Sequence, residues 1–362
     1  MSKHEIDELH KTRTTILENA LKDVNEVNSD NEKKSIYELL EEDIMAADLP
    51  EHEKTKRLSR LIKVRDKKVN LILVGATGSG KSSTVNALFN MDVAKVGVGV
   101  DPETDYITCY ELENLTIWDT PGLGDGVKND ETYNRMLIDK LSELDENGEP
   151  LIDLVLVILD ASSKDLGTSY DLINNTIIPC LGDDNEGRII IGLNQADIAM
   201  KGKHWDSEKN EPDEVLLDFL KKKAESVQNR IFEGTGLKIK PVYYSAGYKE
   251  DGIDQCKPYN LTKLLYYIIN SVPKEKRLAL ADNINPEEEN WLFDDEDKPY
   301  TTYIKRNIWD SIRTCVWLET DFGADNGAEI GEKILGLPGK AVGFIIGGAF
   351  GAIKGFFEGL FS

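Results

Sequence analysis

The sequence predicts an α/β protein with a mixed, mostly parallel, six-stranded sheet and helical segments before and after it. Between residues 69 and 273, short apolar runs alternate with helical patterns, which is typical of a sheet covered by helices. The glycine-rich stretch 75–83 follows the first apolar run directly and leads into a helix, which is the setting of a phosphate-binding turn.

The expected elements follow one another along the chain. Strands are expected near residues 69–75, 106–112, 115–119, 152–160, 188–194 and 240–245. Helices are expected near residues 81–90, 131–144, 167–179, 212–231 and 260–271. Only Glu113 and Asn114 separate the second strand from the third, so these strands should form a hairpin and make the sheet mixed.

Composition divides the chain into four segments. Residues 1–68 are polar and helix-compatible, and residues 69–274 carry the alternating pattern. Residues 275–303 hold nine acidic residues, three basic residues and two prolines, which is the composition of a linker, although Trp291 and Phe293 could hold it in a groove. Residues 304–362 are expected to be helical and end in a glycine-rich tail.

Charge and cysteine content restrict the class of protein. The 362-residue chain is 40% hydrophobic and 30% charged, as expected of a soluble globular protein. A net charge of −23 argues against broad contact with nucleic acid. The four cysteines and four histidines are scattered, so we expect reduced thiols, no His and Cys metal site, and a cytoplasmic protein. No apolar stretch opens the chain, so no secretory leader is expected.

Two segments outside the alternating pattern bear on partners. Residues 54–68 are basic, which favours a solvated amphipathic helix, with a stripe for anionic lipid or a protein partner as the alternative. In the tail, nine glycines share one four-residue register between residues 323 and 359. Its apolar stretch 341–353 has 13 residues, fewer than the roughly 20 of a spanning helix. Residues 339–361 therefore fit a membrane-inserting or interfacial helix, a hairpin packed on the protein, or self-association of tails.

The residue types in the stretch 75–83 suit a polyphosphate. It reads Gly75-Ala76-Thr77-Gly78-Ser79-Gly80-Lys81-Ser82-Ser83 and fits the pattern G-x-x-x-x-G-K-[ST]. Its glycines permit close approach of the backbone, and its N–H groups face the anion at the start of a helix. Lys81 is expected to reach the outer phosphates, and the Ser82 hydroxyl to ligate Mg²⁺.

Two further motifs stand at the ends of later strands. Asp119-Thr120-Pro121-Gly122 ends the third strand; Asp119 is expected to hold Mg²⁺ through a water, and the Gly122 N–H to sense the γ-phosphate. Asn194-Gln195-Ala196-Asp197 ends the fifth strand. The Asp197 carboxylate can accept hydrogen bonds from the ring N–H and the exocyclic amine of guanine, and adenine lacks that pair of donors.

Two more positions complete the expected site. Ser245-Ala246 ends the last strand, where a backbone N–H would meet the guanine carbonyl. Thr104 is expected as the switch threonine that ligates Mg²⁺ when the γ-phosphate is present. Thr108 is the alternative, but it lies inside a predicted strand. Lys81, Thr104 and Gly122 are thus the expected catalytic residues.

With these motifs in order, residues 69–273 resemble the G domain of Era-like and septin-like GTPases, in the translation-factor-related class of P-loop proteins. The loop at 75–83 is similar to those of immunity-related GTPases and septins. The resemblance implies binding of GTP, GDP and Mg²⁺, slow hydrolysis of GTP, and movement of two switch segments. It covers a little over half of the chain and includes neither the N-terminal helices nor the tail.

Three positions depart from the family's pattern. Gln195 replaces the usual Lys of the guanine motif, so guanine selectivity should survive with some loss of affinity. Leu123 replaces the water-orienting Gln of Ras-like members, and Gly78 replaces the Asn of potassium-stimulated relatives. Hydrolysis should therefore be slow, and a second protomer or another protein is expected to complete the site. The alternative is that Leu123 is a packed switch residue without effect on the rate.

Three functions fit these features. The first is a regulatory or mechanochemical GTPase that dimerises through its G domain and contacts a membrane or protein through residues 339–361. The second is a ribosome- or RNA-associated assembly GTPase of the Era type, which the net charge disfavours. The third is an ATP-using P-loop kinase or ATPase, which Asp197 disfavours. We expect the first, in the cytoplasm and peripheral to or partly inserted in a membrane.

Overall fold

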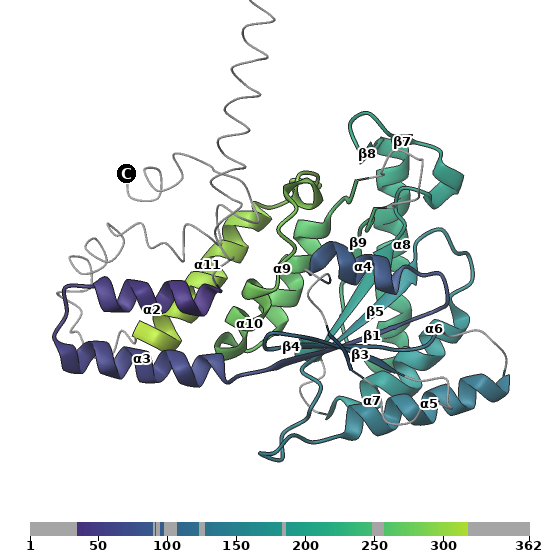
Figure 1. The fold of residues 1–362 in the computed structure, drawn as a ribbon. Helices are drawn as coiled ribbons and strands as arrows, with labels where there is room; N and C mark the ends of the chain where they lie inside the picture. The colour runs from purple at the N-terminus through teal and green to yellow at the C-terminus, as the bar shows by residue number, and fades with distance from the viewer. Residues whose placement is uncertain are drawn as a thin grey trace, which may run out of the picture.

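The computed structural model describes residues 35–89, 91, 95–97, 107–122, 127–182, 186–247 and 257–317. They form three layers, with helices on both faces of a central sheet (Figure 1). Within these ranges the sheet has seven strands, in the order β2-β3-β4-β1-β5-β6-β9. Their bounds are Val69–Gly75 (β1), Lys95–Gly97 (β2), Thr108–Leu112 (β3), Leu115–Asp119 (β4), Leu154–Asp160 (β5), Ile189–Asn194 (β6) and Val242–Tyr243 (β9). A separate hairpin comprises β7 (Trp205–Asp206) and β8 (Glu211–Pro212).

Strand β1 lies at the centre of the fold. It pairs in parallel with β4 on one side and with β5 on the other, and all its residues are buried. Because side chains alternate along a strand, Leu71 and Leu73 enter one core while Ile72 and Val74 enter the other. A strand buried on both faces reads as a continuous apolar run, which is why the sequence revealed it.

The mixed, mostly parallel sheet predicted from the sequence is confirmed. The β3–β4 pair is the expected antiparallel hairpin, and Asn114 turns it with a φ of 61°. The three-residue β2, which no apolar run indicates, adds a strand antiparallel to β3. The last expected strand is short, because only Val242 and Tyr243 pair with β6.

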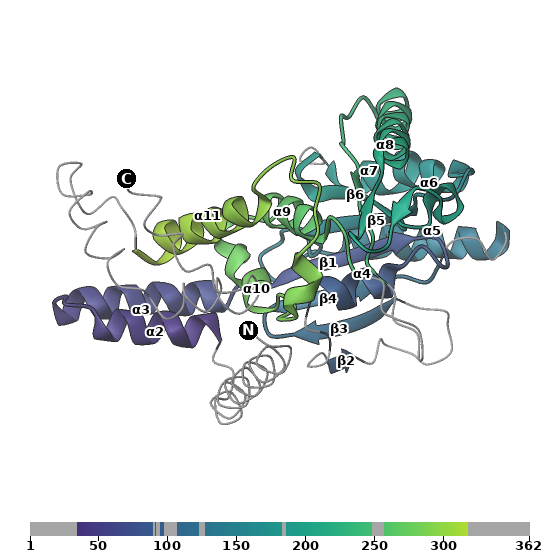
Figure 2. The same cartoon turned by 90° about the horizontal axis from the view of Figure 1, so that it is seen from above.

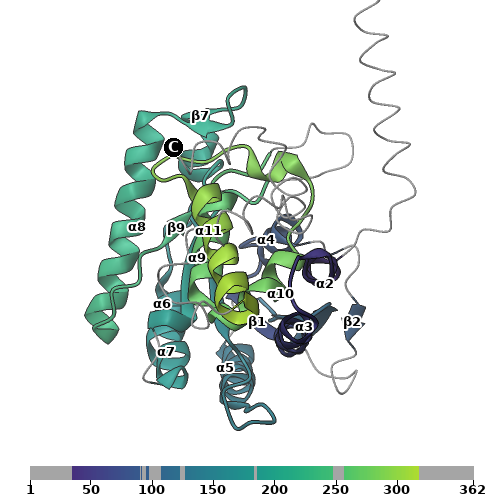
Figure 3. The same cartoon turned by 90° about the vertical axis from the view of Figure 1, so that its left-hand side faces the viewer.

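Two layers of helices cover the sheet (Figure 3). The layer over Leu71 and Leu73 contains α2 (Ile36–Ala46), α3 (Glu51–Arg65), α4 (Lys81–Leu88), α9 (Leu261–Ser271), α10 (Arg277–Asp282) and α11 (Tyr300–Ile312). The opposite layer contains α5 (Val127–Ser142), α6 (Gly167–Leu172), α7 (Ile178–Cys180) and α8 (Glu214–Thr235). A π-helical turn, Ile173–Ile177, joins α6 to α7. Short helical turns occupy Glu186–Arg188, Ala199–Gly202, Lys274–Lys276, Glu288–Trp291 and Arg313–Trp317.

Helices α2, α3 and α11 lie together beyond the edge of the sheet (Figure 2). A capping box starts α2, because the Ser35 hydroxyl accepts from the Glu38 N–H while the Glu38 carboxylate accepts from the Ser35 N–H. The turn after α11 packs on α3, where the Arg57 guanidinium lies 4.5 Å from the centre of the Trp317 ring. The N-terminal and C-terminal parts of the described chain therefore meet.

The acidic segment 275–303, expected as a linker, is packed against the sheet layer. It contains α10, whose Leu278 and Leu280 are fully buried, and the buried indole of Trp291. Its acidic residues dominate the composition, but its apolar residues recur where a helix and a turn can bury them. A linker in the sense of a solvated spacer is therefore wrong for this segment, whereas the four domain boundaries stay predictions.

Several predicted features lie outside the described residues. They are the N-terminal residues 1–34, Thr104, Leu123 and the glycine-rich tail. In the part of the chain that the structure describes, no helix combines the length and the apolar character needed to cross a bilayer. The same residues contain no cluster of three or more His, Cys, Asp or Glu side chains suited to a metal ion.

Candidate nucleotide-binding site

The glycine-rich loop connects β1 to α4 at the carboxyl edge of the sheet (Figure 1). Gly78 and Gly80 have φ values of 78° and 88°, in the left-handed region that favours glycine. A Cβ on Gly75 would lie 2.3 Å from the Ile158 carbonyl oxygen, and one on Gly80 would lie 2.1 Å from Asn194 Nδ2. The glycines are therefore required by backbone conformation or by close packing.

Other loop residues differ in exposure. Thr77 and Ser83 are exposed, Ala76 is half-buried, and Ser79 is 2% exposed. The Ser79 hydroxyl oxygen is buried and forms no hydrogen bond with a described residue. An unpaired buried hydroxyl is unfavourable unless a ligand or water supplies its partner.

Lys81 is the first residue of α4, and its side chain folds back over the loop. Its Nζ donates to the carbonyl oxygens of Gly75 at 3.0 Å and Ala76 at 3.4 Å. Burial lowers the pKa of Lys81, and the carboxylate of Asp119 acts in the opposite direction. An ammonium group at the start of a helix, beside the glycine-rich loop, is placed to receive phosphate oxygens.

Ser82 and Asp119 meet beside this ammonium group. Ser82 Oγ donates to Asp119 Oδ2 at 3.4 Å. Burial raises the pKa of Asp119, and Lys81 and Ser82 counteract that rise. Asp119 Oδ1 is buried and accepts no hydrogen bond from a described residue. A hydroxyl and an unpartnered carboxylate oxygen are the hard oxygen donors that Mg²⁺ prefers, so these residues fit the ion.

The end of β4 lies against the phosphate loop. Thr120 Oγ1 donates to the Leu73 carbonyl oxygen at 2.7 Å and lies 3.0 Å from the Tyr133 hydroxyl. A Cβ on Gly122 would lie 1.9 Å from Thr77 Oγ1. Gly122 thus brings its backbone next to the loop, as a sensor of the γ-phosphate requires. Thr104, the expected switch threonine, lies outside the described residues.

Asn194 joins the phosphate loop to residues 245–247 after β9, which we name the base-side loop. Its Nδ2 donates to the Ser79 carbonyl oxygen at 2.9 Å, and its Oδ1 accepts from the Ala246 N–H at 3.0 Å. Asn194 is only 3% exposed. Two buried hydrogen bonds from one side chain therefore fix the two loops relative to each other.

Gln195 makes a second contact with the same loop. Its Nε2 donates to the Gly78 carbonyl oxygen at 2.7 Å, from a backbone with a φ of 65°. A left-handed conformation is uncommon for a residue of this type, and the surrounding contacts hold it there. The glutamine amide thus spans from the base side to the phosphate side of the site.

Asp197 is half-buried and has no hydrogen bond or ion pair with another described residue. Among the described residues, its carboxylate is therefore not committed to a partner. By contrast, the Ser245 N–H and carbonyl are both bonded to Tyr259, at 3.0 and 2.9 Å. Because Asn194 takes the Ala246 N–H, neither expected N–H is free for a guanine carbonyl.

Gly247, which the sequence motif did not indicate, offers a further N–H group at this position. Its φ is 74°, and its N–H donates to Ser245 Oγ at 3.3 Å, the longest of the three bonds that the N–H groups of residues 245–247 donate. A weak bond to a hydroxyl is the easiest of the three to exchange for a ligand carbonyl. In the sequence, a glycine directly after Ser245-Ala246 was the feature that could have indicated this backbone donor.

Two buried hydroxyl groups, of Thr84 and Tyr244, connect the start of α4 to the chain after β9. Thr84 Oγ1 donates to the Gly80 carbonyl oxygen at 2.7 Å and lies 2.7 Å from the Tyr244 hydroxyl. A Cβ on Gly192 would lie 2.8 Å from Tyr244 Cε1. This contact between α4 and the residue after β9 depends on residues 160 positions apart, so the local pattern could not indicate it.

The comparisons agree with this arrangement. A model of the 50S ribosome-binding GTPase family matches residues 70–195, which span the phosphate loop, Asp119 and Asn194. The chain contains a P-loop G domain. Its sheet order and the loop between β1 and α4 provide the α/β architecture of that domain.

Curated relatives are similar to parts of this chain. An uncharacterized protein of Escherichia coli, YkfA, is 25% identical over 163 residues, covering 42% of this chain and 50% of the relative. Septin-12 of Bos taurus is 39% identical over 80 residues, covering 19% of this chain and 22% of the septin. The chain thus spans half or less of the length of these relatives.

Solved structures with a similar G domain include Toc33 from Arabidopsis thaliana. A dimerization-deficient Toc33 mutant is 17% identical, with 67% of this chain and 97% of that chain covered and a TM-score of 0.40. Toc33 in complex with Mg²⁺ and GMPPNP is 19% identical, with 59% and 84% covered and a TM-score of 0.37.

Proposed function

We propose that this protein binds GTP and GDP with Mg²⁺, hydrolyses GTP slowly and changes conformation with the nucleotide. The proposal rests on Asp197, whose carboxylate has no hydrogen bond or ion pair with another described residue. Asp197 follows Asn194 and Gln195, whose side chains donate to carbonyl oxygens of the phosphate loop. A carboxylate in that position favours guanine because it accepts from two donors that adenine lacks.

Each residue then has a stated role. Lys81 neutralises the β- and γ-phosphates, and the loop N–H groups bind their oxygens. Ser82 would ligate Mg²⁺, and the Asp119 carboxylate would help to hold it. The Gly122 N–H donates to the γ-phosphate, and Gly247 supplies the N–H for the guanine carbonyl. Mg²⁺ supplies charge neutralisation between the β- and γ-phosphates when bound.

Nucleotide titrations of the full chain test the base assignment. The wild type should bind GDP at least a hundredfold more tightly than ADP, because a wrong base leaves the Asp197 carboxylate unpaired. Asp197→Asn should weaken GDP and gain affinity for xanthosine diphosphate, whose carbonyl at C2 can accept from the new amide. Equal affinity of the wild type for ADP and GDP would reject the guanine reading in favour of an ATP-using P-loop enzyme.

Slow hydrolysis leads to a second proposal, that two copies complete one catalytic site. It rests on Leu123, an apolar side chain where a water-orienting group is expected, because leucine cannot position the attacking water. The GTPase rate per molecule should rise with protein concentration in excess GTP. A rate per molecule that is flat over a hundredfold range of concentration would contradict the proposal.

The tail is proposed to contact a membrane or a protein partner, on the basis of its nine glycines in one register. Co-sedimentation with anionic liposomes should recover the full chain in the pellet and a variant lacking residues 338–362 in the supernatant. Equal recovery of the two in the supernatant would exclude the lipid contact.

An assembly GTPase that acts on the ribosome is the alternative function, and the description of the matching family model favours it. The net charge of −23 counts against it, because RNA binding needs clustered basic side chains. Co-migration of the GTP-bound protein with ribosomal subunits on a sucrose gradient would favour this alternative.

A further inference from the structure

Residues 285–297, which connect α10 to α11, contact both ends of the proposed nucleotide site; we name them the strap. The strap begins at Asn285, next to the last turn of α4, and reaches Asp295 beside β9. It lies within the segment whose composition predicted a linker. Its contacts with α4 and β9 suggest a second role for it beyond burial of apolar surface.

At its first half, the strap caps the carboxyl end of α4. An α-helix leaves its last four carbonyl groups without partners inside the helix. The Phe89 N–H reaches the Val85 carbonyl, and the strap supplies the other three donors. These bonds are Asn285 Nδ2 to Asn86 O at 2.8 Å, Asn290 Nδ2 to Ala87 O at 3.3 Å, and Asn285 N to Leu88 O at 2.9 Å.

The capped helix is the one that carries Lys81 and Ser82 in its first turn. It has only eight residues, so its two ends cannot move independently. The asparagines are 9% (Asn285) and 4% (Asn290) exposed, which keeps water from replacing them. Their bonds therefore fix the position of the phosphate-binding end.

At its second half, the strap holds the base-side loop. Asn260 Nδ2 donates to the Tyr243 carbonyl oxygen at 3.1 Å, and its backbone N–H donates to the Phe293 carbonyl oxygen at 2.9 Å. The Asp295 N–H donates to Asn260 Oδ1 at 2.8 Å. Tyr259, the residue before Asn260, forms the two backbone bonds to Ser245. The base-side loop is thus bonded to Tyr259, and the next residue, Asn260, is bonded to the strap.

The centre of this attachment is a buried ion pair between Lys263 and Asp295, whose side chains are each 5% exposed. Asp295 also accepts from the hydroxyls of Tyr243 at 3.0 Å and Tyr300 at 3.2 Å. Burial opposes the charge of Asp295, but the ion pair with Lys263, the Tyr243 hydroxyl and the Asp297 N–H lower its pKa below the usual value. Removing one member of such a pair leaves an uncompensated buried charge.

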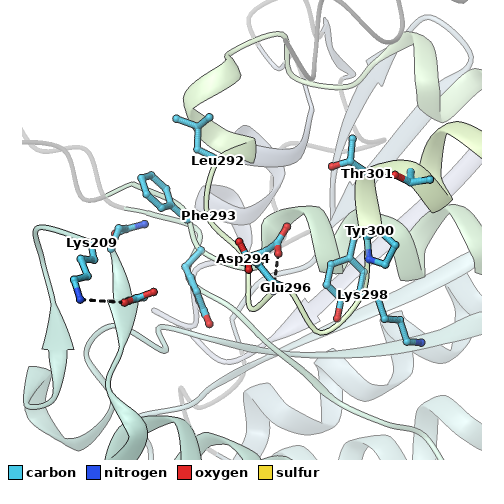
Figure 4. Close-up of a pocket in the computed structure, with 13 residues that line it drawn as sticks. Lys209, Leu292, Phe293, Asp294, Glu296, Lys298, Tyr300 and Thr301 are labelled. Atoms are coloured by element: carbon cyan, nitrogen blue, oxygen red, sulfur yellow. Dashed lines mark hydrogen bonds and ion pairs between the residues drawn. The ribbon is translucent and has the colours of Figure 1, made fainter. Parts of the chain in front are cut away.

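The strap then continues into α11, because Tyr300 is the first residue of that helix. Residues 292–294, 296 and 298–302 also line an open cavity of about 560 Å³, which Lys209 and Glu211 of the β7–β8 hairpin line as well (Figure 4). Tyr259 lines the same cavity. One side of this region is thus solvent-accessible, while Asp295 itself is enclosed.

We propose that the strap positions the nucleotide at both ends, with Asp295 setting the base-side loop and Asn285 and Asn290 setting the phosphate end of α4. Because Tyr300 joins Asp295 to α11, the position of α11 is coupled to the base-side loop. This inference rests on the proposed guanine-nucleotide function. The residues named are positioning residues, since they touch protein groups that would touch the nucleotide.

The base-side arm of the test compares GDP with 6-thio-GDP, which keeps the ring N–H and the amine but replaces the carbonyl oxygen with a weaker acceptor. The preference of the wild type for GDP measures the base-side N–H contact. Asp295→Asn should reduce that preference about three- to tenfold, the value of one displaced hydrogen bond. Tyr300→Phe keeps the ring, removes one hydroxyl, and should change the preference in the same direction by a smaller factor.

The phosphate-side arm compares GDP with GMP. Asn290→Ala removes one bond to α4 and should reduce the preference for GDP over GMP about three- to tenfold, while the preference over 6-thio-GDP stays unchanged. Asn283→Ala is the matched control. Asn283 is buried, and its Nδ2 donates to Glu113 O and Ala279 O, both at 2.7 Å, away from the site.

The two ratios separate positioning from stability. A strap that only stabilises the fold would weaken the binding of GDP, 6-thio-GDP and GMP by one factor, as we expect of Asn283→Ala, and leave both ratios at the wild-type values. That outcome overturns the inference. The inference is also overturned if Asn290→Ala changes only the preference for GDP over 6-thio-GDP and not the preference for GDP over GMP. Failure of the wild type to bind any guanine nucleotide would instead reject the proposed function.

Discussion

The side chain of Asn194 gives the sharpest test of how the site is assembled. Asn194→Ala removes the bond to the Ser79 carbonyl and the bond from the Ala246 N–H. Each buried group that loses its partner costs about 1–3 kcal/mol, so the free energy of unfolding should fall by about 2–6 kcal/mol. The lower half of that range applies where water reaches the freed groups.

The same change should weaken nucleotide binding more than its effect on stability alone predicts. Without Asn194, the phosphate loop and the base-side loop must be brought together when the nucleotide binds. A cost of about 1.4 kcal/mol for that ordering raises the GDP dissociation constant tenfold. We therefore expect at least a tenfold loss of GDP affinity, measured by titration under conditions where the variant is fully folded.

Asn283→Ala serves as the comparison, since it also removes a buried asparagine side chain with two hydrogen bonds, here to the carbonyl oxygens of Glu113 and the buried Ala279. Urea unfolding gives the stability of both variants, and GDP titration gives their affinity. If Asn194→Ala lowers stability but binds GDP as tightly as Asn283→Ala, then Asn194 is only a core residue and the reasoning is refuted.

Three further predictions concern glycine geometry, metal binding and pH. Gly80→Ala should abolish GDP binding while Gly78→Ala should weaken it less, because both need a positive φ but only a Cβ at Gly80 meets Asn194, at 2.1 Å; equal losses would refute the contact. Asp119→Asn should raise the thermal stability of the nucleotide-free protein at pH 7 and remove the added stability given by Mg²⁺ with GDP, since burial raises the pKa of Asp119 and makes its charge unfavourable; the gain should shrink as the pH falls through the raised pKa, and a gain that persists below the ordinary value of 3.8 would contradict this. Asp295 has a lowered pKa, so its contribution to the free energy of unfolding is present above the usual value of 3.8 and is lost as the pH falls through the lower folded value. The stability difference between wild type and Asp295→Asn should therefore shrink in acid. A constant difference down to pH 2 would argue against the ion pair.

The sequence predicted the phosphate loop and most of the base-side motif because the relevant chemistry is local. Gly78 and Gly80 are required by the backbone conformation of a few consecutive residues. Lys81 and Ser82 follow them at fixed spacing on the first turn of a helix. Asn194, Gln195 and Asp197 lie together because they end one strand. Such features depend on neighbours in the chain, so residue type and order are enough to indicate them.

Local order did not indicate which backbone groups are free to meet a base. Ser245 and Ala246 have the right residue types, but Tyr259 and Asn194 occupy their N–H groups in the structure. Those partners come from a later loop and an earlier strand. Availability of a donor is a property of the whole fold, since every buried N–H group finds some partner.

The chain by itself thus determined the class of fold, the phosphate loop and the preference for guanine that we propose. Only the tertiary structure decided that the acidic segment 275–303 is packed, that Gly247 has the weakest-held N–H of the base-side loop, and that the strap holds α4. The bonds from Asn285 and Asn290 to α4 join residues 199 and 203 positions apart. Contacts over such separations arise when the layers pack together, and no periodicity within the sequence records them.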